Sequence, residues 1–111
     1  MKRYIKELKN KIIPVLKRYD VVRAAVFGSF VRGEMKKNSD IDLLIIKETS
    51  KPFHKRWMEV CDMVHGILGA TPFSPFVITS KELKRRLARG DHFFKEILSE
   101  GEVLYEAKFS S

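Results

Sequence analysis

The stretch VVRAAVFGSFVRGEMKKNSDIDLLII, residues 21–46, decides how this chain folds and where its chemistry lies. Residues 21–27 are mostly apolar and β-branched and stop at Gly28, which predicts a buried strand. Residues 29–33 leave room for little more than one turn of helix. Residues 40–46 predict a second strand, and because it is apolar on both faces after its first three positions, we expect it in the centre of a sheet.

The flanking segments continue an alternation of helices and strands. An amphipathic repeat, a Thr-x-x-Glu capping box and glycine stops predict helices at 3–19, 52–68, 79–90 and 91–100, and strands at 73–79 and 103–105. Pro14 should kink or split the first helix. The order α-β-α-β-α-β-α-α-β predicts a single α/β (α+β) domain over residues 1–111, a small mixed β-sheet flanked by helices.

Composition excludes several classes of protein. With 44% hydrophobic and 32% charged residues, the 111-residue chain fits neither a disordered nor a membrane protein. Charged residues interrupt the apolar residues at its N-terminus, so this segment lacks the continuous apolar core of a signal peptide. The single cysteine, Cys61, excludes an internal disulfide framework and a cysteine-based zinc site. We therefore expect a soluble, cytoplasmic protein with no membrane partner.

A net charge of +8 favours anionic partners such as nucleotides, nucleic acid or an acidic protein. A basic stripe on the helix at 79–90 could contact RNA phosphates or an acidic partner, although a solvated face is the simpler explanation; its residues are Lys81, Lys84, Arg85 and Arg89. No aromatic-interleaved nucleic-acid module is present in the sequence. Charge alone therefore leaves a small basic RNA-binding domain as a remote alternative.

The first chemical motif is Gly28-Ser29, at the end of a strand and the start of a helix. A glycine there lets the backbone approach a ligand closely, and the free N–H groups of a helix start attract phosphate. Ser29 adds a hydroxyl donor at the same place. The simpler alternative is a tight turn capped by Ser29, because such turns are common.

The second motif is Asp40-Ile41-Asp42. Residues two apart on a strand face the same way, and this face continues into Leu44 and Ile46. The carboxylates of Asp40 and Asp42 should therefore lie at the edge of the hydrophobic core. At about 6 Å and an effective dielectric near 20 they would repel by roughly 3 kcal/mol. Magnesium completed by substrate phosphates would offset this repulsion. A salt bridge to Arg32 or a nearby lysine is the alternative.

Together these motifs resemble the nucleotidyltransferase superfamily that includes DNA polymerase beta. The matching residues are Gly28-Ser29, Arg32-Gly33-Glu34 and Asp40-Ile41-Asp42-Leu43. Within the superfamily the chain is most similar to the minimal nucleotidyltransferases, which are often encoded beside a HEPN-type partner. The resemblance implies that Gly28 and Ser29 hold the terminal phosphates, that Asp40 and Asp42 bind one or two Mg²⁺ ions, and that Arg32 pairs with a phosphate or a neighbouring acid.

The activity implied by this resemblance is transfer of a nucleoside monophosphate, AMP, from a nucleoside triphosphate, ATP, to a hydroxyl. The acceptor would be a side chain of a HEPN-type toxin, which would make the chain an antitoxin. Active members of the superfamily usually supply a third carboxylate from the following strand, but residues 73–78 contain no acid and Phe76 stands at the expected position. Neither Asp62 nor Glu48 is a convincing substitute. The alternative is therefore a catalytically weakened module that binds nucleotide and partner.

Overall fold

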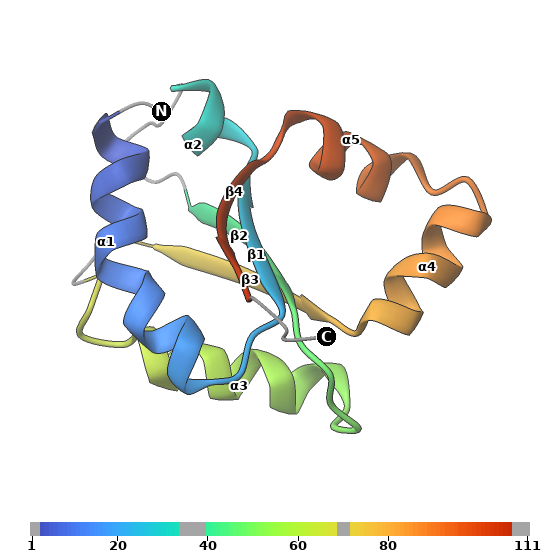
Figure 1. Cartoon of the computed structure of the whole chain (residues 1–111), viewed down its shortest axis with the longest axis horizontal. Coiled ribbons are helices and arrows are strands. Elements are labelled where there is room, and N and C mark those ends of the chain that lie inside the picture. The colour runs from blue at the N-terminus through green and yellow to red at the C-terminus, as the bar shows by residue number, and fades with distance from the viewer. Residues whose placement is uncertain (1–2, 34–39, 69–71, 108–111) are drawn as a thin grey trace.

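The structure is a computed structural model of the chain. It describes residues 3–33, 40–68 and 72–107. Four strands form one sheet in the order β3-β2-β1-β4, with β1 at Arg23–Phe27, β2 at Ile41–Ile46, β3 at Phe73–Ile78 and β4 at Glu102–Glu106 (Figure 1). Because β1 runs antiparallel to β2 and β4 while β2 and β3 are parallel, the sheet is mixed. The predicted fold class and the central place of β2 are confirmed.

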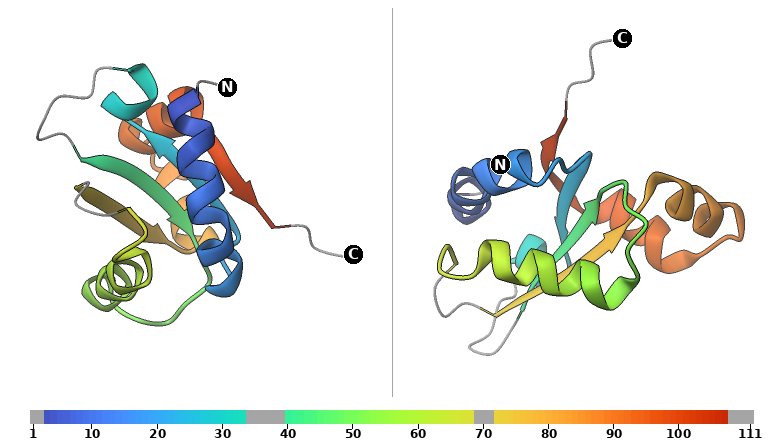
Figure 2. Two further views of the ribbon diagram at one scale, coloured as in Figure 1. Left: turned by 90° about the vertical axis from the view of Figure 1, so that its left-hand side faces the viewer. Right: turned by 90° about the horizontal axis from the view of Figure 1, so that it is seen from below.

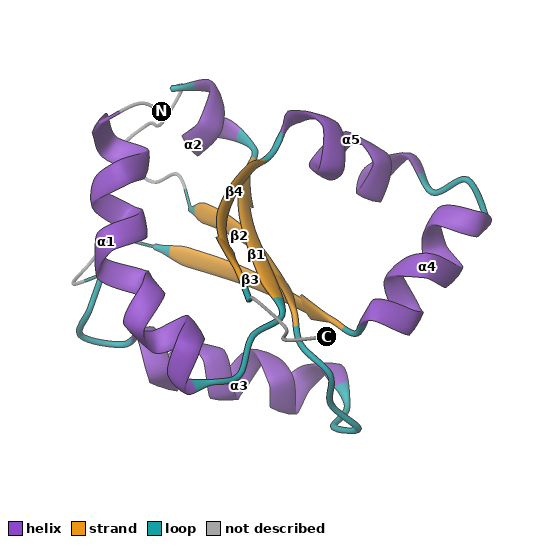
Figure 3. Cartoon of the chain, in the orientation of Figure 1, coloured by secondary structure: helices purple, strands orange, loops and turns teal. Residues whose placement is uncertain are grey.

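Over the residues that the structure describes, five helices surround this sheet, and Figure 3 shows them in purple around the orange strands. Helices α1 and α3 cover one face of the sheet, α4 and α5 cover the other, and α2 follows the end of β1 (Figure 2). Their bounds are α1 Arg3–Arg18, α2 Ser29–Arg32, α3 Phe53–Val64, α4 Ser80–Ala88 and α5 His92–Glu100. The element order agrees with the predicted one. In the described part of the chain, no helix has the length and apolar character needed to cross a bilayer.

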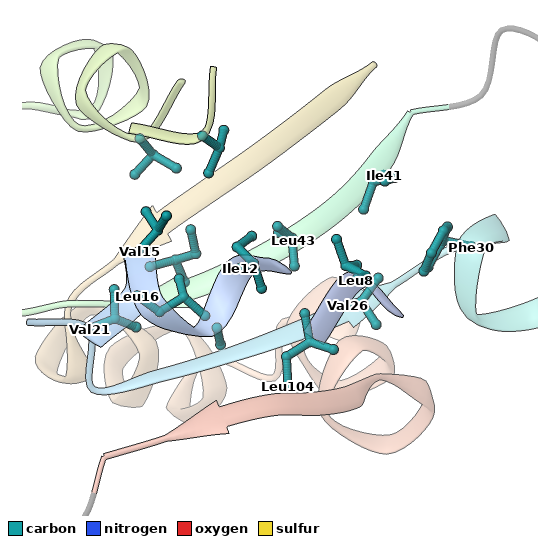
Figure 4. Packing of buried hydrophobic residues seen from close by; sticks show 14 of the residues in the cluster. Leu8, Ile12, Val15, Leu16, Val21, Val26, Phe30, Ile41, Leu43 and Leu104 are labelled. Atoms are coloured by element: carbon teal, nitrogen blue, oxygen red, sulfur yellow. The ribbon is translucent and has the colours of Figure 1, made fainter. Parts of the chain in front are cut away.

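Helix α1 supplies much of the core on its face of the sheet. Its buried side chains recur every three or four residues, and they pack against β1, β2 and β4 (Figure 4). These buried residues are Ile5, Leu8, Ile12, Val15 and Leu16. Of the two outcomes predicted for Pro14, a kink or a split, the split does not occur, because α1 runs unbroken through Pro14. Pro14 lies on the exposed side, so the Asn10 carbonyl that loses its helical donor also lies on an exposed residue, where water reaches it.

Helix α3 differs from its prediction in length and in orientation. It ends at Val64, and its buried residues are Arg56, Val60 and Val64. The spacing of Trp57, Cys61, Val64 and Leu68 in the sequence predicts one apolar side of this helix; Val64 is buried as predicted, but Trp57 is half exposed. The reason is a buried cation. The Arg56 guanidinium donates to a carboxylate oxygen of Glu82 at 2.7 Å, and this pairing lets a charged side chain occupy the core position.

The predicted capping box at the start of α4 is confirmed. The Thr79 hydroxyl accepts from the Glu82 N–H at 3.1 Å, and the Thr79 N–H donates to Glu82 Oε1 at 2.8 Å. Since the same carboxylate also accepts from Arg56, it joins α3, the end of β3 and α4. The hydrogen bond from Arg56 is the main reason that the pKa of Glu82 falls to about 2.

Candidate active site

The two predicted motifs meet at the end of β1. Phe27 pairs with Asp42 across the antiparallel β1–β2 ladder, and the chain then turns at Gly28 with φ +74°. A Cβ at Gly28 would lie 2.6 Å from Oδ2 of Asp42. Glycine is therefore needed here for its backbone conformation and because any side chain would push the Asp42 carboxylate aside.

The turn after Gly28 forms a single turn of helix. Its first helical hydrogen bond runs from the Arg32 N–H to the Gly28 carbonyl at 3.3 Å. The N–H groups of residues 29–31 precede this bond, as the first N–H groups of a helix do, and are the donors that a phosphate could use. The Ser29 side chain lies outside the described part of the chain, so its predicted role stays a prediction.

Helix α1 holds this turn in place. The rings of Tyr4 and Phe30 meet edge to face with centroids 5.0 Å apart, and the Tyr4 hydroxyl donates to the Val31 carbonyl at 3.2 Å. Phe30 is buried in the core under the turn. The backbone near Gly28 is thus anchored by packing from beneath.

Asp40 and Asp42 interact as the sequence predicted. Asp40 is exposed just before β2, whereas Asp42 is half-buried on the face that continues into Leu44. Burial raises the pKa of Asp42, the charge of Asp40 raises it further, and Arg32 lowers it only partly. Because Arg32 lowers this pKa while burial and Asp40 raise it, the described residues fit both the predicted magnesium site and the predicted ion pair with Arg32. Two neighbouring carboxylates suit a hard divalent cation.

The third strand contributes no acid to this site. In the parallel β2–β3 register, Ser74 pairs with Asp42 and Phe76 pairs with Leu44. The residue beside Asp42 is therefore Ser74, two positions before the Phe76 that the family pattern indicates. Among residues 3–33, 40–68 and 72–107 there is no group of three or more His, Cys, Asp or Glu side chains placed to hold a metal.

The two acids considered as substitutes lie elsewhere. The Glu48 carboxylate accepts a 2.8 Å hydrogen bond from the Ser80 N–H, beyond the far end of β2. Asp62 is an exposed residue of α3, on the opposite face of the sheet from Asp42. Neither of these two acids therefore lies beside Asp42.

A groove of about 110 Å³ adjoins the turn. It is lined by Gly28 and Arg32, and also by residues of α5 that the sequence did not indicate. These are Phe93, Glu96, Ile97 and Glu100. No local signal could have found them, because more than sixty positions separate α5 from Gly28 and only the sheet topology brings them together.

The chain matches the family model described as polymerase beta, nucleotidyltransferase, over residues 10–110. It therefore belongs to the polymerase beta nucleotidyltransferase family. Two relatives from Methanocaldococcus jannaschii carry the provisional name protein adenylyltransferase. One is 54% identical over 41 residues, covering 37% of this chain and 44% of the relative, and the other is 41% identical over 66 residues, covering 58% and 74%.

A further relative, the protein adenylyltransferase MntA of Thermococcus cleftensis, is 38% identical over 52 residues, which cover 47% of this chain and 52% of MntA. The chain thus spans only about half the length of two of these relatives. Among solved structures, a toxin–antitoxin complex with AMP-PNP aligns over 90% of this chain and 74% of its own, with a TM-score of 0.59 and 18% identity. A nucleotidyltransferase structure from Sulfolobus solfataricus aligns over 94% and 81%, with a TM-score of 0.55 and 19% identity. At such identities the structures show the shared fold.

Proposed function

We propose that this domain binds a nucleoside triphosphate, ATP, with Mg²⁺ and transfers its AMP moiety to a hydroxyl group. The observation that carries the proposal is the contact between the Gly28 backbone and the Asp42 carboxylate. It brings a turn with phosphate-binding N–H groups against a pair of acids that repel one another. Neither the glycine turn alone nor the pair of acids alone would define such a site, because glycine turns and Asp-x-Asp strands are both common.

Each group has a defined role in this proposal. The N–H groups of residues 29–31 bind the terminal phosphates, with Arg32 beside them. Asp40 and Asp42 hold one or two Mg²⁺ ions, which when bound stabilise charge on the entering and leaving oxygens. The acceptor oxygen bonds to the α-phosphorus, the bond to the α–β bridging oxygen breaks, pyrophosphate leaves, and the hydroxyl proton passes to solvent.

The acceptor in this proposal is a side chain of a partner protein, a HEPN-type toxin, for which the chain serves as a cytoplasmic antitoxin. The names of the relatives, protein adenylyltransferase, support a protein acceptor, and a toxin–antitoxin complex is among the structures that share the fold. Ser74 beside Asp42 favours a second candidate, a module that binds nucleotide and partner with little turnover, because a third acid is missing there.

Intact-mass spectrometry tests the proposal directly. The protein is mixed with the product of its neighbouring gene, ATP and Mg²⁺. The partner should gain the mass of one AMP, and Asp40→Asn and Asp42→Asn should abolish the gain. Asp62→Asn, an exposed carboxylate on the other face, is the control and should leave it unchanged. Copurification without added mass would support the binding module instead.

A further inference from the structure

A continuous row of aromatic rings leads away from the candidate site. It starts at Phe27, the partner of Asp42, and passes from Phe93 to Phe76 and then to Phe53, with successive centroids 5.9, 6.3 and 6.1 Å apart. We call these four residues the aromatic row. Phe93 and Phe53 are 47% and 48% exposed, so the row is open to solvent along much of its length. Apolar surface of this kind marks an interaction site.

The far end of the aromatic row opens into a pocket of about 350 Å³ at the edge of the sheet. Its lining comes from α3, β3 and α4, and consists of Phe53, Trp57, Pro75, Phe76, Val77 and Arg86. Trp57 is 51% exposed because α3 turns Arg56, not Trp57, into the core. A pocket of this size suits one large apolar side chain of a partner.

The chemistry in the proposed function, on which this inference rests, determines the side from which the acceptor arrives. The phosphates of the leaving pyrophosphate lie at the Gly28 turn, on the β1 side of Asp42. In an in-line displacement the acceptor enters opposite the leaving group. Since β2 lies between β1 and β3, the acceptor enters over β3, where Ser74 flanks Asp42 and the aromatic row continues at Phe76.

Charge indicates what kind of segment covers this surface. Helix α4, which supplies Arg86 to the pocket, carries four basic residues, and Arg89 follows at its end. Its single acid, Glu82, is already bound to Arg56, and the Arg86 guanidinium lies 3.8 Å from the carboxylate of Asp91 just beyond the helix. An acidic partner complements such a surface. Aromatic residues with arginine are typical of the core of a protein interface, so a protein segment fits this surface.

We propose that the protein substrate docks on the aromatic row and its pocket through an acidic amphipathic segment. An apolar side chain of that segment fills the pocket beside Trp57. Its acidic residues face Arg86 and the rest of α4. The segment runs along the edge strand β3, and its hydroxyl-bearing residue reaches Asp42 from the Ser74 side.

Trp57 is the only tryptophan in the chain and lies in the pocket, so its emission reports directly on docking. The probe is a synthetic helical peptide with leucines along one face, glutamates elsewhere and one tyrosine. A twin with lysines in place of the glutamates is the charge control. The acidic peptide should shift the Trp57 emission to shorter wavelength and should be adenylylated in the presence of Mg²⁺ and ATP, whereas the lysine twin should do neither.

Variants locate the binding surface. Phe53→Ser and Arg86→Glu should each weaken binding of the acidic peptide by about tenfold. Met58→Ser is the matched control, since Met58 is 56% exposed on the same helix but does not line the pocket, and it should change nothing. ATP affinity, measured by calorimetry, should be the same in all three variants.

Several results would overturn the docking proposal. These are absence of peptide binding, equal binding of the lysine twin, an effect of Met58→Ser as large as that of Phe53→Ser, or displacement of the peptide by single-stranded RNA. A dimer in sedimentation that Phe53→Ser abolishes would also overturn it by assigning the surface to a second copy. If one of these results is found while ATP still binds and Asp42→Asn still weakens ATP binding, the proposed function stands. If Asp42→Asn does not affect ATP binding in the same protein, the proposed function itself is refuted.

Discussion

The backbone of Gly28 lies against the carboxylate of Asp42, although fourteen positions separate them in the chain. The contact follows from the antiparallel pairing of β1 with β2, which sets Phe27 opposite Asp42 and leaves Gly28 as the first residue past the ladder. Each residue constrains the other: the acid needs the space that a side chain would fill.

Gly28→Ala should separate stability from ligand binding. Alanine at φ +74° should cost about 1–2 kcal/mol of the free energy of unfolding, and its Cβ should turn the Asp42 carboxylate away. Gly90→Ala is the matched control, because Gly90 has φ +78° with nothing within 4 Å of the added Cβ. Urea denaturation should show similar losses for both variants. Calorimetry should show Mg²⁺–ATP binding weakened at least about tenfold in Gly28→Ala alone. Equal binding by the two variants would contradict this assignment.

Asp42→Asn should stabilise the metal-free protein at neutral pH. Because the folded-state pKa of Asp42 is raised, its ionised form destabilises the fold; this cost is absent below the usual aspartate range and appears as pH rises through the raised pKa. In EDTA the variant should gain roughly 0.5–1 kcal/mol at pH 7, a modest figure because solvent screens this half-buried group, and almost nothing at pH 3. Thermal unfolding at both pH values measures this difference. A variant less stable than wild type at pH 7 would show that the carboxylate is already neutralised by a partner.

Glu82→Gln should destabilise the protein and should reduce the loss of stability that the wild type shows at acid pH. Breaking this pair leaves the Arg56 side chain, only 6% exposed, with weaker partners, which should cost about 3 kcal/mol. Since the pKa of Glu82 is lowered to about 2, the wild type should keep this stabilisation above the usual glutamate range and lose it as pH falls from about 4.5 towards 2. Urea titrations across that range measure the difference. Glu7→Gln, in an exposed pair with Arg3, should cost under about 0.5 kcal/mol, and an equal loss there would refute the special role of Glu82.

Ser74→Asp should test the missing acid. An acid here would lie beside Asp42 in the parallel register and could accept the proton of the attacking hydroxyl. We expect AMP transfer to rise towards the roughly hundredfold that a positioned base contributes. Phe76→Asp, at the position that the family pattern indicates, should only destabilise, because Phe76 contacts the rings of Phe53, Phe93 and Phe94. Rates from intact-mass time courses measure this, and a faster Phe76→Asp protein would reverse the assignment.

Local patterns predicted the features that depend on local physics. The two-sided apolarity of residues 41–46 predicted a central strand, and β2 lies between β3 and β1. Thr79 and Glu82 predicted the start of α4 because a capping box is complete within four residues. In these cases all the interacting groups are close in the sequence.

Features that depend on distant partners could not be predicted in this way. Arg56 is buried because Glu82, twenty-six residues later, neutralises it, so an apolar pattern selected Trp57 in error. The neighbour of Asp42 on β3 depends on the β2–β3 register, which the sequence of either strand alone cannot fix, and that register places Ser74 there. The contact between Phe27 and Phe93 exists only once α5 packs on the sheet.

The most direct test of the central claim is calorimetric titration of ATP into the protein with and without Mg²⁺. The account predicts saturable binding with Mg²⁺ that weakens at least about tenfold in EDTA, in Asp42→Asn and in Asp40→Asn. Asp62→Asn should bind as wild type does. Binding that is equally strong in EDTA and in both aspartate variants, or no binding at all, would contradict the claim that the Gly28 turn and these two acids form one site.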